Sequence, residues 1–216
     1  MKVAVCPRQR EPCPDMGSAG VIIVDSGGAN IASLKFALQR LGSEPVLTTD
    51  PDLIQAASHV ILPGVGAAAD AMKRLTHHRL ADLIPSLSQP VLGICLGMQL
   101  LAECSEENDT TCLGVLAGKA QRLAGDSGIP VPNMGWCRTQ FEDRHPLLQN
   151  IDSGSYFYYL HSYALPVSDY TLATARHACA FSAMTSKNNF FATQFHPERS
   201  SAAGSQLLRN FLDLGA

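Results

Sequence analysis

A cysteine between two glycines lies near the middle of the chain, in the apolar stretch PVLGICLGMQLL at 90–101. Cysteine in such a stretch often serves as a small buried hydrophobe. The pattern G-x-C-x-G, after a strand-like run and before a helix-like run, is also typical of a strained turn that presents a nucleophile. In that case the N–H groups that begin the helix, the first being that of Leu96, can stabilise negative charge on sulfur or on an oxyanion. The pentapeptide alone leaves a packing role and a nucleophilic role for Cys95 evenly matched.

A nucleophilic cysteine needs a base, and the segment QFHPERSS offers His196 two residues before Glu198. Pro197 pushes the preceding residue toward an extended conformation, in which residues i and i+2 point to the same side. Glu198 can then orient the His196 ring while the other ring nitrogen faces the cysteine. His161, in the segment LHSY, is the alternative base, but it has no acidic partner at a suitable spacing. The sequence therefore favours His196.

A second glycine-rich segment, LPGVGA at 62–67, follows the strand-like run HVIL. Ligands of α/β proteins bind at the carboxyl ends of strands, where this loop is expected. The backbone amide near Val65 is a possible second donor to an oxyanion. Taken in isolation, a plain strand-to-helix turn is the stronger interpretation of this loop.

The elements that must position these residues alternate between strands and helices in the first half of the chain, which predicts a parallel, doubly wound sheet. The expected strands are residues 21–24, 45–49, 59–63 and 90–94, and the expected helices are 31–42, capped by Asn30, 67–75, 80–87 and 96–104. From about residue 115, short alternating strands predict a more antiparallel second half, at 118–124, 136–141, 155–165, 170–176, 181–186 and 189–195, before a last helix at 200–215.

Composition excludes several classes of function. The 216 residues are 46% hydrophobic and 16% charged, with a net charge of −3, which predicts a folded protein without a nucleic-acid partner. No apolar run has the length of a membrane span, and residues 1–20 lack the apolar core of a signal peptide, so we expect a cytoplasmic protein. The seven cysteines form no CxxC pair, and we expect neither a disulfide framework nor a metal site. Residues 1–20 are expected to be an extension, with Met16 as a possible internal start, and residues 21–216 a single domain.

The motifs PGVG, GICLGMQ and FHPE, in this order, resemble those of the class I glutamine amidotransferases, over most of residues 20–214. The resemblance implies a flavodoxin-like α/β fold, in which a mostly parallel sheet is flanked by helices. It implies that Cys95 forms a thioester with glutamine, that His196 moves the proton to ammonia, and that Glu198 orients the histidine. It implies no cofactor. It further implies a substrate site formed by Gly66, Gln99, Ser162 and Tyr163.

The flanking segments DSGGAN, VPNMGW, FYYLHSYA and QFHPERSS narrow the resemblance to the glutaminase subunits of imidazole glycerol phosphate synthase. That resemblance implies a heterodimer with a (β/α)8-barrel cyclase that receives ammonia, in histidine biosynthesis. It implies that Asn30, Trp136 and Arg199 lie near the interface. It also implies that hydrolysis of L-glutamine is weak until the partner binds its ligand, with Val65 as the switch.

The chain departs from that family at two positions, because the family's PHMGWN reads PNMGWC here, with Asn133 and Cys137. We expect these changes to affect docking of the partner. Three other functions stay open: an amidotransferase of the anthranilate or guanylate type, a free γ-glutamyl hydrolase, and a catalytically silent binding subunit. The intact set of Cys95, His196 and Glu198 argues against the silent subunit.

Overall fold

The computed structural model describes residues 20–27, 31–125, 128–141 and 144–215. The expected extension, residues 1–20, lies outside these ranges apart from Gly20. Asn30, expected to cap a helix and to lie near a partner, also lies outside them. Within the described ranges, no helix is both long enough and apolar enough to cross a membrane.

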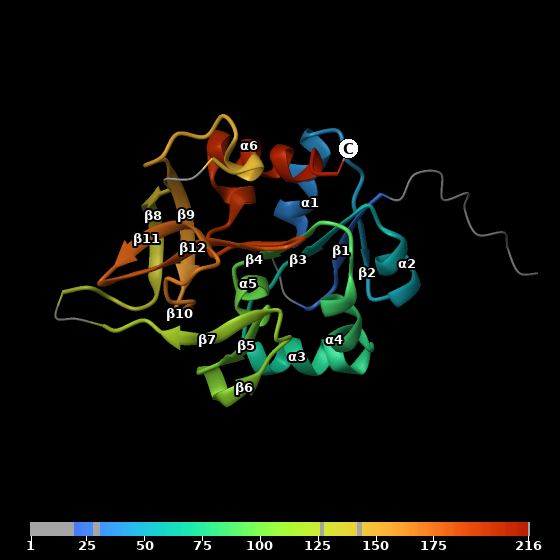
Figure 1. Ribbon diagram of the computed structural model, residues 1–216, viewed down its shortest axis with the longest axis horizontal. Helices are drawn as coiled ribbons and strands as arrows, with labels where there is room; N and C mark the ends of the chain where they lie inside the picture. The colour runs from blue at the N-terminus through green and yellow to red at the C-terminus, as the bar shows by residue number, and fades with distance from the viewer. Residues whose placement is uncertain (1–19, 28–30, 126–127, 142–143, 216) are drawn as a thin grey trace, which may run out of the picture.

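Nine strands of the described residues form one mixed sheet, in the order β2-β1-β3-β4-β13-β12-β11-β8-β9 (Figure 1). The strands from β2 to β13 pair in parallel, and those from β13 to β9 pair antiparallel. Their bounds are β1 Val21–Val24, β2 Val46–Thr48, β3 His59–Leu62, β4 Val91–Ile94, β8 Asn133–Gln140, β9 Tyr156–His161, β11 Thr171–His177, β12 Cys179–Lys187 and β13 Phe190–Thr193. The predicted α/β fold class is confirmed, and β13, from the second half of the chain, joins the parallel strands to the antiparallel ones.

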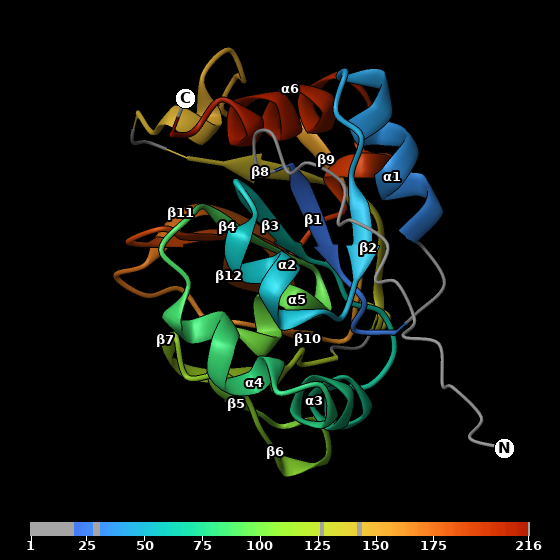
Figure 2. The ribbon, with the colours of Figure 1, turned by 90° about the vertical axis from the view of Figure 1, so that its right-hand side faces the viewer.

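Helices cover both faces of the parallel part of this sheet (Figures 1 and 2). On one face lie α1 and α6, and on the other α2 to α5. Alternate residues of each strand belong to two hydrophobic cores on opposite faces of the sheet. Ile23 packs with the residues of α1 and α6, whereas its neighbour Ile22 packs with those of α2, α3 and α4. The helix bounds are α1 Ile31–Arg40, α2 Pro51–Ala56, α3 Ala68–His77, α4 Leu80–Leu83, α5 Leu96–Leu100 and α6 Ser201–Leu212.

A second, four-stranded sheet lies on the same side of the large sheet as α3 and α5 and beside these helices (Figure 1), in the order β10-β7-β5-β6. Its strands are β5 Ala102–Ser105, β6 Thr110–Thr111, β7 Leu116–Arg122 and β10 Tyr163–Ala164. The helix predicted over 96–104 is therefore wrong in its second half, because α5 ends at Leu100 and the chain turns into β5. There the backbone pairs with β6 and β7, and this tertiary pairing outweighs the local helical pattern. Four short 3-10 turns complete the described elements: Ile84–Ser86, Glu107–Asp109, Pro146–Leu148 and Pro197–Arg199.

The carboxyl ends of three adjacent parallel strands meet at one edge of the large sheet. Cys95 directly follows β4, the loop at 63–66 follows β3, and His196 comes three residues after the end of β13. Neighbouring parallel strands place their carboxyl ends at the same edge, which is where α/β proteins form sites. The sheet therefore brings together segments that are more than 100 residues apart in sequence.

Candidate active site

The turn at Cys95 has the strained backbone of a nucleophile elbow. Its φ of 54° and ψ of −107° lie in a region that residues with a side chain rarely adopt. The turn is held on both sides, because the Cys95 N–H donates to the carbonyl of Thr193 at 2.7 Å and the Cys95 carbonyl accepts from Met98 and Gln99. The thiol is buried and donates to the carbonyl oxygen of Leu160 at 3.6 Å. Such strain persists where the surroundings impose it, typically at functional sites.

The two glycines around Cys95 let the helix after it pack directly against the strand ends. A Cβ atom on Gly97 would collide with the carbonyl oxygen of Leu62 at the end of β3. A Cβ atom on Gly93 would lie 2.9 Å from the carbonyl oxygen of Gly97. Close backbone approach, which only glycine allows here, therefore explains the G-x-C-x-G pattern.

His196 lies between the sulfur of Cys95 and the carboxylate of Glu198. Its Nδ1 atom is 2.9 Å from Glu198 Oε1, and the two side chains are only 6% and 4% exposed. His196 has the extended backbone expected before a proline, with φ −98° and ψ 98°. Burial by itself would lower the pKa of His196, but interactions with Cys95 and Glu198 outweigh it and raise that pKa to about 10. Both partners thus favour the protonated form of the ring, which can take a proton from the sulfur and later act as an acid.

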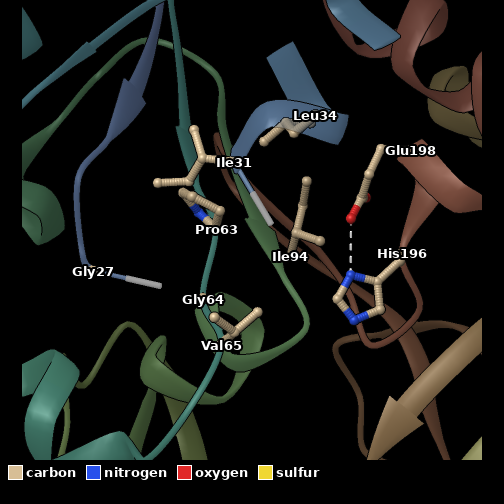
Figure 3. Close-up of a pocket in the computed structure, with 9 residues that line it drawn as sticks. All are labelled: Gly27, Ile31, Leu34, Pro63, Gly64, Val65, Ile94, His196 and Glu198. Carbon is tan, nitrogen blue, oxygen red and sulfur yellow. Dashed lines mark hydrogen bonds and ion pairs between the residues drawn. The ribbon is translucent and has the colours of Figure 1, made fainter. Parts of the chain in front are cut away.

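A small apolar space of about 20 Å³ adjoins the histidine and its carboxylate (Figure 3). Ile31 and Leu34 of α1 and Ile94 of β4 line it, together with the loop after β3. In such a setting water is scarce, and an ion pair is stronger than it would be at the surface.

His161, the alternative base, has both ring nitrogens engaged elsewhere. Its Nδ1 atom donates to the carbonyl oxygen of Tyr163 at 2.9 Å, and its Nε2 atom lies 3.1 Å from Asn133 Nδ2. Burial lowers the pKa of His161 to about 4, so the ring is neutral at pH 7. The geometry therefore favours His196 as the group that exchanges protons with Cys95.

A cleft of about 350 Å³ opens above the sulfur. Its volume falls in the range of small-molecule sites. It brings together nine of the residues selected from the sequence: Val65, Gly66, Cys95, Leu96, Gln99, Ser162, Tyr163, His196 and Arg199. Glu198 lies behind the histidine, and Trp136 lies on a neighbouring surface described below. Among the described residues, no group of three or more His, Cys, Asp or Glu side chains is arranged to hold a metal ion.

Comparison with known proteins places this chain in a family. A sequence model described as Glutamine amidotransferase class-I matches residues 22–214. The HisH subunit of imidazole glycerol phosphate synthase from Vibrio cholerae is 46% identical over 200 residues, which cover 90% of this chain and 98% of that protein. The chain belongs to the class-I glutamine amidotransferases, in the HisH family. HisH of Escherichia coli K12 is 47% identical over 195 residues, covering 90% of this chain and 99% of that protein. The resemblance inferred from the three motifs is thus confirmed.

Solved structures show the same fold at lower identity. A crystal structure of a glutamine amidotransferase has a TM-score of 0.70 at 19% identity, covering 90% of this chain and 97% of that chain. The structure of PurLQS from Thermotoga maritima has a TM-score of 0.67 at 18% identity, covering 90% and 98%. At such identities the likeness concerns the fold alone.

Two residues of this candidate site, Glu107 and Gln194, were not predicted from the sequence. The carboxylate of Glu107 lines the cleft and accepts a hydrogen bond from the Ala68 N–H at 2.7 Å, at the start of α3. Gln194 is fully buried next to Cys95 and Gln99. The i, i+2 spacing that links His196 to Glu198 also links Gln194 to His196, so Gln194 was predictable from the sequence. Glu107 had no local signal, because only the turn between β5 and β6 brings it to the cleft.

Apolar side chains form an exposed face beside the cleft, on the outer side of the β8–β9 hairpin. This β8–β9 face consists of Met134, Trp136, Tyr156 and Leu160, which are 69%, 52%, 58% and 38% exposed. Met134 pairs with Leu160 in the sheet and Trp136 with Tyr158, so these side chains are neighbours. Contiguous apolar patches of this kind are uncommon on a monomer and typically mark an interaction site. Tyr158, on the same face, joins the two expected interface residues: its ring meets Trp136 edge-on at 6.2 Å and lies 4.4 Å from the guanidinium carbon of Arg199.

The two residues that depart from the family pattern, Asn133 and Cys137, lie on the opposite side of β8 from this exposed face. Side chains alternate along β8, so Met134 and Trp136 are exposed while Asn133 is buried. The thiol of Cys137 donates to Asn133 Oδ1 at 3.3 Å. Burial raises the pKa of this thiol above its ordinary value. The expectation that both departures affect docking directly is not supported by this geometry, because both side chains contact the interior around His161.

Proposed function

We propose that this chain is the glutaminase subunit of an imidazole glycerol phosphate synthase in histidine biosynthesis. It hydrolyses L-glutamine and delivers ammonia to a partner cyclase of the (β/α)8-barrel type. The observation that carries this proposal is the position of the His196 ring between the sulfur of Cys95 and the carboxylate of Glu198, in a cleft of suitable size. The HisH relatives, each a named subunit of that synthase, support the same assignment. The cytoplasmic location stays a prediction.

The chemistry begins when the thiol proton of Cys95 passes to His196 and the sulfur attacks the carboxamide carbon of glutamine. A carbon–sulfur bond forms, and the carbonyl oxygen becomes an oxyanion. The N–H groups of Leu96 and Val65 are the proposed donors to it, since the first hydrogen-bonded amides of α5 are those of Met98 and Gln99. The tetrahedral adduct collapses when His196 protonates the nitrogen, which leaves as ammonia.

The second half of the reaction releases glutamate. Water attacks the thioester carbon, His196 takes a proton from that water, and the carbon–sulfur bond breaks. Glu198 holds the histidine ring through Nδ1 during both proton transfers, which keeps Nε2 directed at the reaction.

The cleft offers complementary groups for the two ends of the amino acid. The carbonyl oxygen of Tyr163 already accepts two hydrogen bonds, from Gln99 and His161. The carboxylate of Glu107 is therefore the better partner for the ammonium group of glutamine. Ser162, the neighbouring Tyr163 amide and Gly66 are the proposed contacts of the substrate's carboxylate end.

Glu107→Gln is expected to raise the KM for glutamine about tenfold with little change in kcat, because a charge-assisted hydrogen bond becomes a neutral one. A glutamine at this position keeps an oxygen for the Ala68 N–H, so α3 should remain intact. Steady-state release of glutamate in the presence of the cyclase measures both constants. Glu106→Gln is the matched control, since its carboxylate accepts from Arg122 N instead. Equal KM values for the two variants would exclude Glu107 as the ammonium site.

We further propose that the partner cyclase covers the β8–β9 face, with Trp136 at its centre. Trp136→Ala is expected to weaken binding of the cyclase about 30-fold or more, as is usual for a central interface tryptophan. Isothermal titration of the chain with the cyclase measures this change. Leu47→Ala, which alters an exposed leucine at the opposite edge of the sheet, should bind as the parent does.

The same titrations, combined with glutaminase assays, separate the remaining alternatives. A chain that serves the cyclase should hydrolyse glutamine faster when the cyclase and its ligand are present. Equally fast hydrolysis in the absence of any partner would favour a free γ-glutamyl hydrolase. Failure to bind the cyclase, with activation by a different synthetase, would favour an amidotransferase of another type.

A further inference from the structure

A buried glutamine connects the sulfur of Cys95 to the substrate segment. Gln194 is 0% exposed, and its backbone N–H is held by the carbonyl oxygen of Ala183 at 2.9 Å. Its side-chain Nε2 atom lies 3.8 Å from Cys95 Sγ, and its Oε1 atom accepts from Gln99 Nε2 at 3.2 Å. A side-chain amide without solvent contact needs partners for its polar atoms, and here the nucleophile is one of them.

Further hydrogen bonds determine which end of Gln194 faces the sulfur. Gln99 Nε2 also donates to the carbonyl oxygen of Tyr163, at 2.8 Å, and this oxygen accepts from His161 Nδ1 as well. A carbonyl oxygen can only accept, so the nitrogen of Gln99 must point toward it. Gln194 must then present its oxygen to Gln99, and consequently its NH₂ group to Cys95.

These hydrogen bonds continue on the buried side of β8. Because His161 donates through Nδ1, its Nε2 atom is an acceptor and receives the Nδ2–H of Asn133, at 3.1 Å. The Oδ1 atom of Asn133 is then free to accept from the thiol of Cys137. Every donor in this chain of hydrogen bonds faces an acceptor, so the orientations of the three side-chain amides are mutually consistent.

We propose that Gln194 is a positioning residue that directs the sulfur of Cys95 by donating a hydrogen bond to it, and that Gln99 sets the orientation of Gln194. This inference rests on the proposed glutaminase function. Among the residues that the structure describes, three hydrogen-bonding groups surround the buried thiol: the Leu160 carbonyl, His196 and Gln194. The Leu160 carbonyl can only accept, and His196 gives its proton to the leaving nitrogen. The amide of Gln194 keeps its N–H throughout and can donate to a sulfur that carries negative charge. Gln99 and the Tyr163 carbonyl thereby tie the nucleophile to the segment proposed to bind substrate.

Gln194→Met tests the proposal, because methionine has a similar shape and no N–H donor. In the complex with the cyclase, kcat for glutamine should fall about tenfold or more while KM stays within about twofold, as expected for a misdirected nucleophile. The rate at which iodoacetamide alkylates Cys95, followed by mass spectrometry of its peptide, should fall by a similar factor. Asn210→Leu is the control. Asn210 lies on α6 and is another buried side-chain amide, which donates to the carbonyls of Leu147 and Gln149. It should lower the unfolding midpoint in urea without changing kcat or the alkylation rate.

A double-mutant cycle with Gln99→Met tests the second part of the proposal. If Gln99 acts on the sulfur through Gln194, the alkylation rate of the double variant should match that of Gln194→Met alone. Independent, multiplying effects would overturn this part. Unchanged kcat and alkylation in Gln194→Met, with only a lower unfolding midpoint, would reduce Gln194 to a packing residue. Alkylation needs no glutamine, so it still reports on positioning if the parent complex fails to hydrolyse glutamine and the proposed function itself is wrong.

Discussion

Cys95→Ala is expected to abolish glutamine-dependent formation of imidazole glycerol phosphate and to leave the ammonia-dependent reaction of the same complex intact. The substitution removes the sulfur that forms the thioester, whereas added ammonia reaches the cyclase without it. The loss should be about 10⁴-fold or more, as for other enzymes that lose their nucleophile. Parallel assays with glutamine and with an ammonium salt, on the purified heterodimer, measure the two activities.

Cys104→Ala provides the control for this substitution. Cys104 is a partly buried free cysteine on β5, outside the residues that line the cleft. It should retain both activities. Glutamine-dependent activity that survives in Cys95→Ala would show that the elbow does not carry the nucleophile. Loss of the ammonia reaction as well would instead indicate that the variant no longer docks or folds.

Glu198→Gln is expected to lower kcat about 100-fold and to move the alkaline limb of the pH profile toward neutrality. The pKa of His196 is raised to about 10, and Glu198 is one of the groups that raise it. Without that carboxylate the imidazolium loses its proton at a lower pH, so the acid that protonates the leaving nitrogen is lost at a lower pH. Initial rates with glutamine between pH 6 and pH 10 measure the shift. An alkaline limb that does not move would contradict the role assigned to Glu198.

The raised pKa of His196 also makes the free energy of unfolding depend on pH. The pKa of His196 in the folded protein is raised above the ordinary value of 6.5. The stabilisation from its imidazolium is therefore fully present below about pH 6.5 and is lost as the pH rises through about 10. Unfolding in urea should thus show a difference between the parent and Glu198→Gln that shrinks as the pH rises. Glu44→Gln, which alters a carboxylate bonded to Gln39 at the surface, should show no such trend.

Much of the fold follows from local pattern. The alternation of apolar strands and amphipathic helices up to β4 predicted the parallel sheet, because each period reflects which faces of an element are buried. The site was predictable for a related reason. The elbow and the His-Pro-Glu segment each carry their geometry within a few residues, through glycine and proline. Where geometry came from distant pairing, prediction failed, as it did for 102–105, which form β5 rather than the end of a helix.

The sequence by itself determined the family and identified the proposed nucleophile, its base and the orienting carboxylate, since each depends on residue type and short spacing. Only the tertiary structure decided the rest. It brought Glu107 into the cleft, placed Gln194 beside the sulfur, and directed Asn133 inward to His161 rather than outward to the β8–β9 face. Those relations depend on which strands are neighbours and in what register, and non-local pairing of that kind is decided by the packing of the whole sheet.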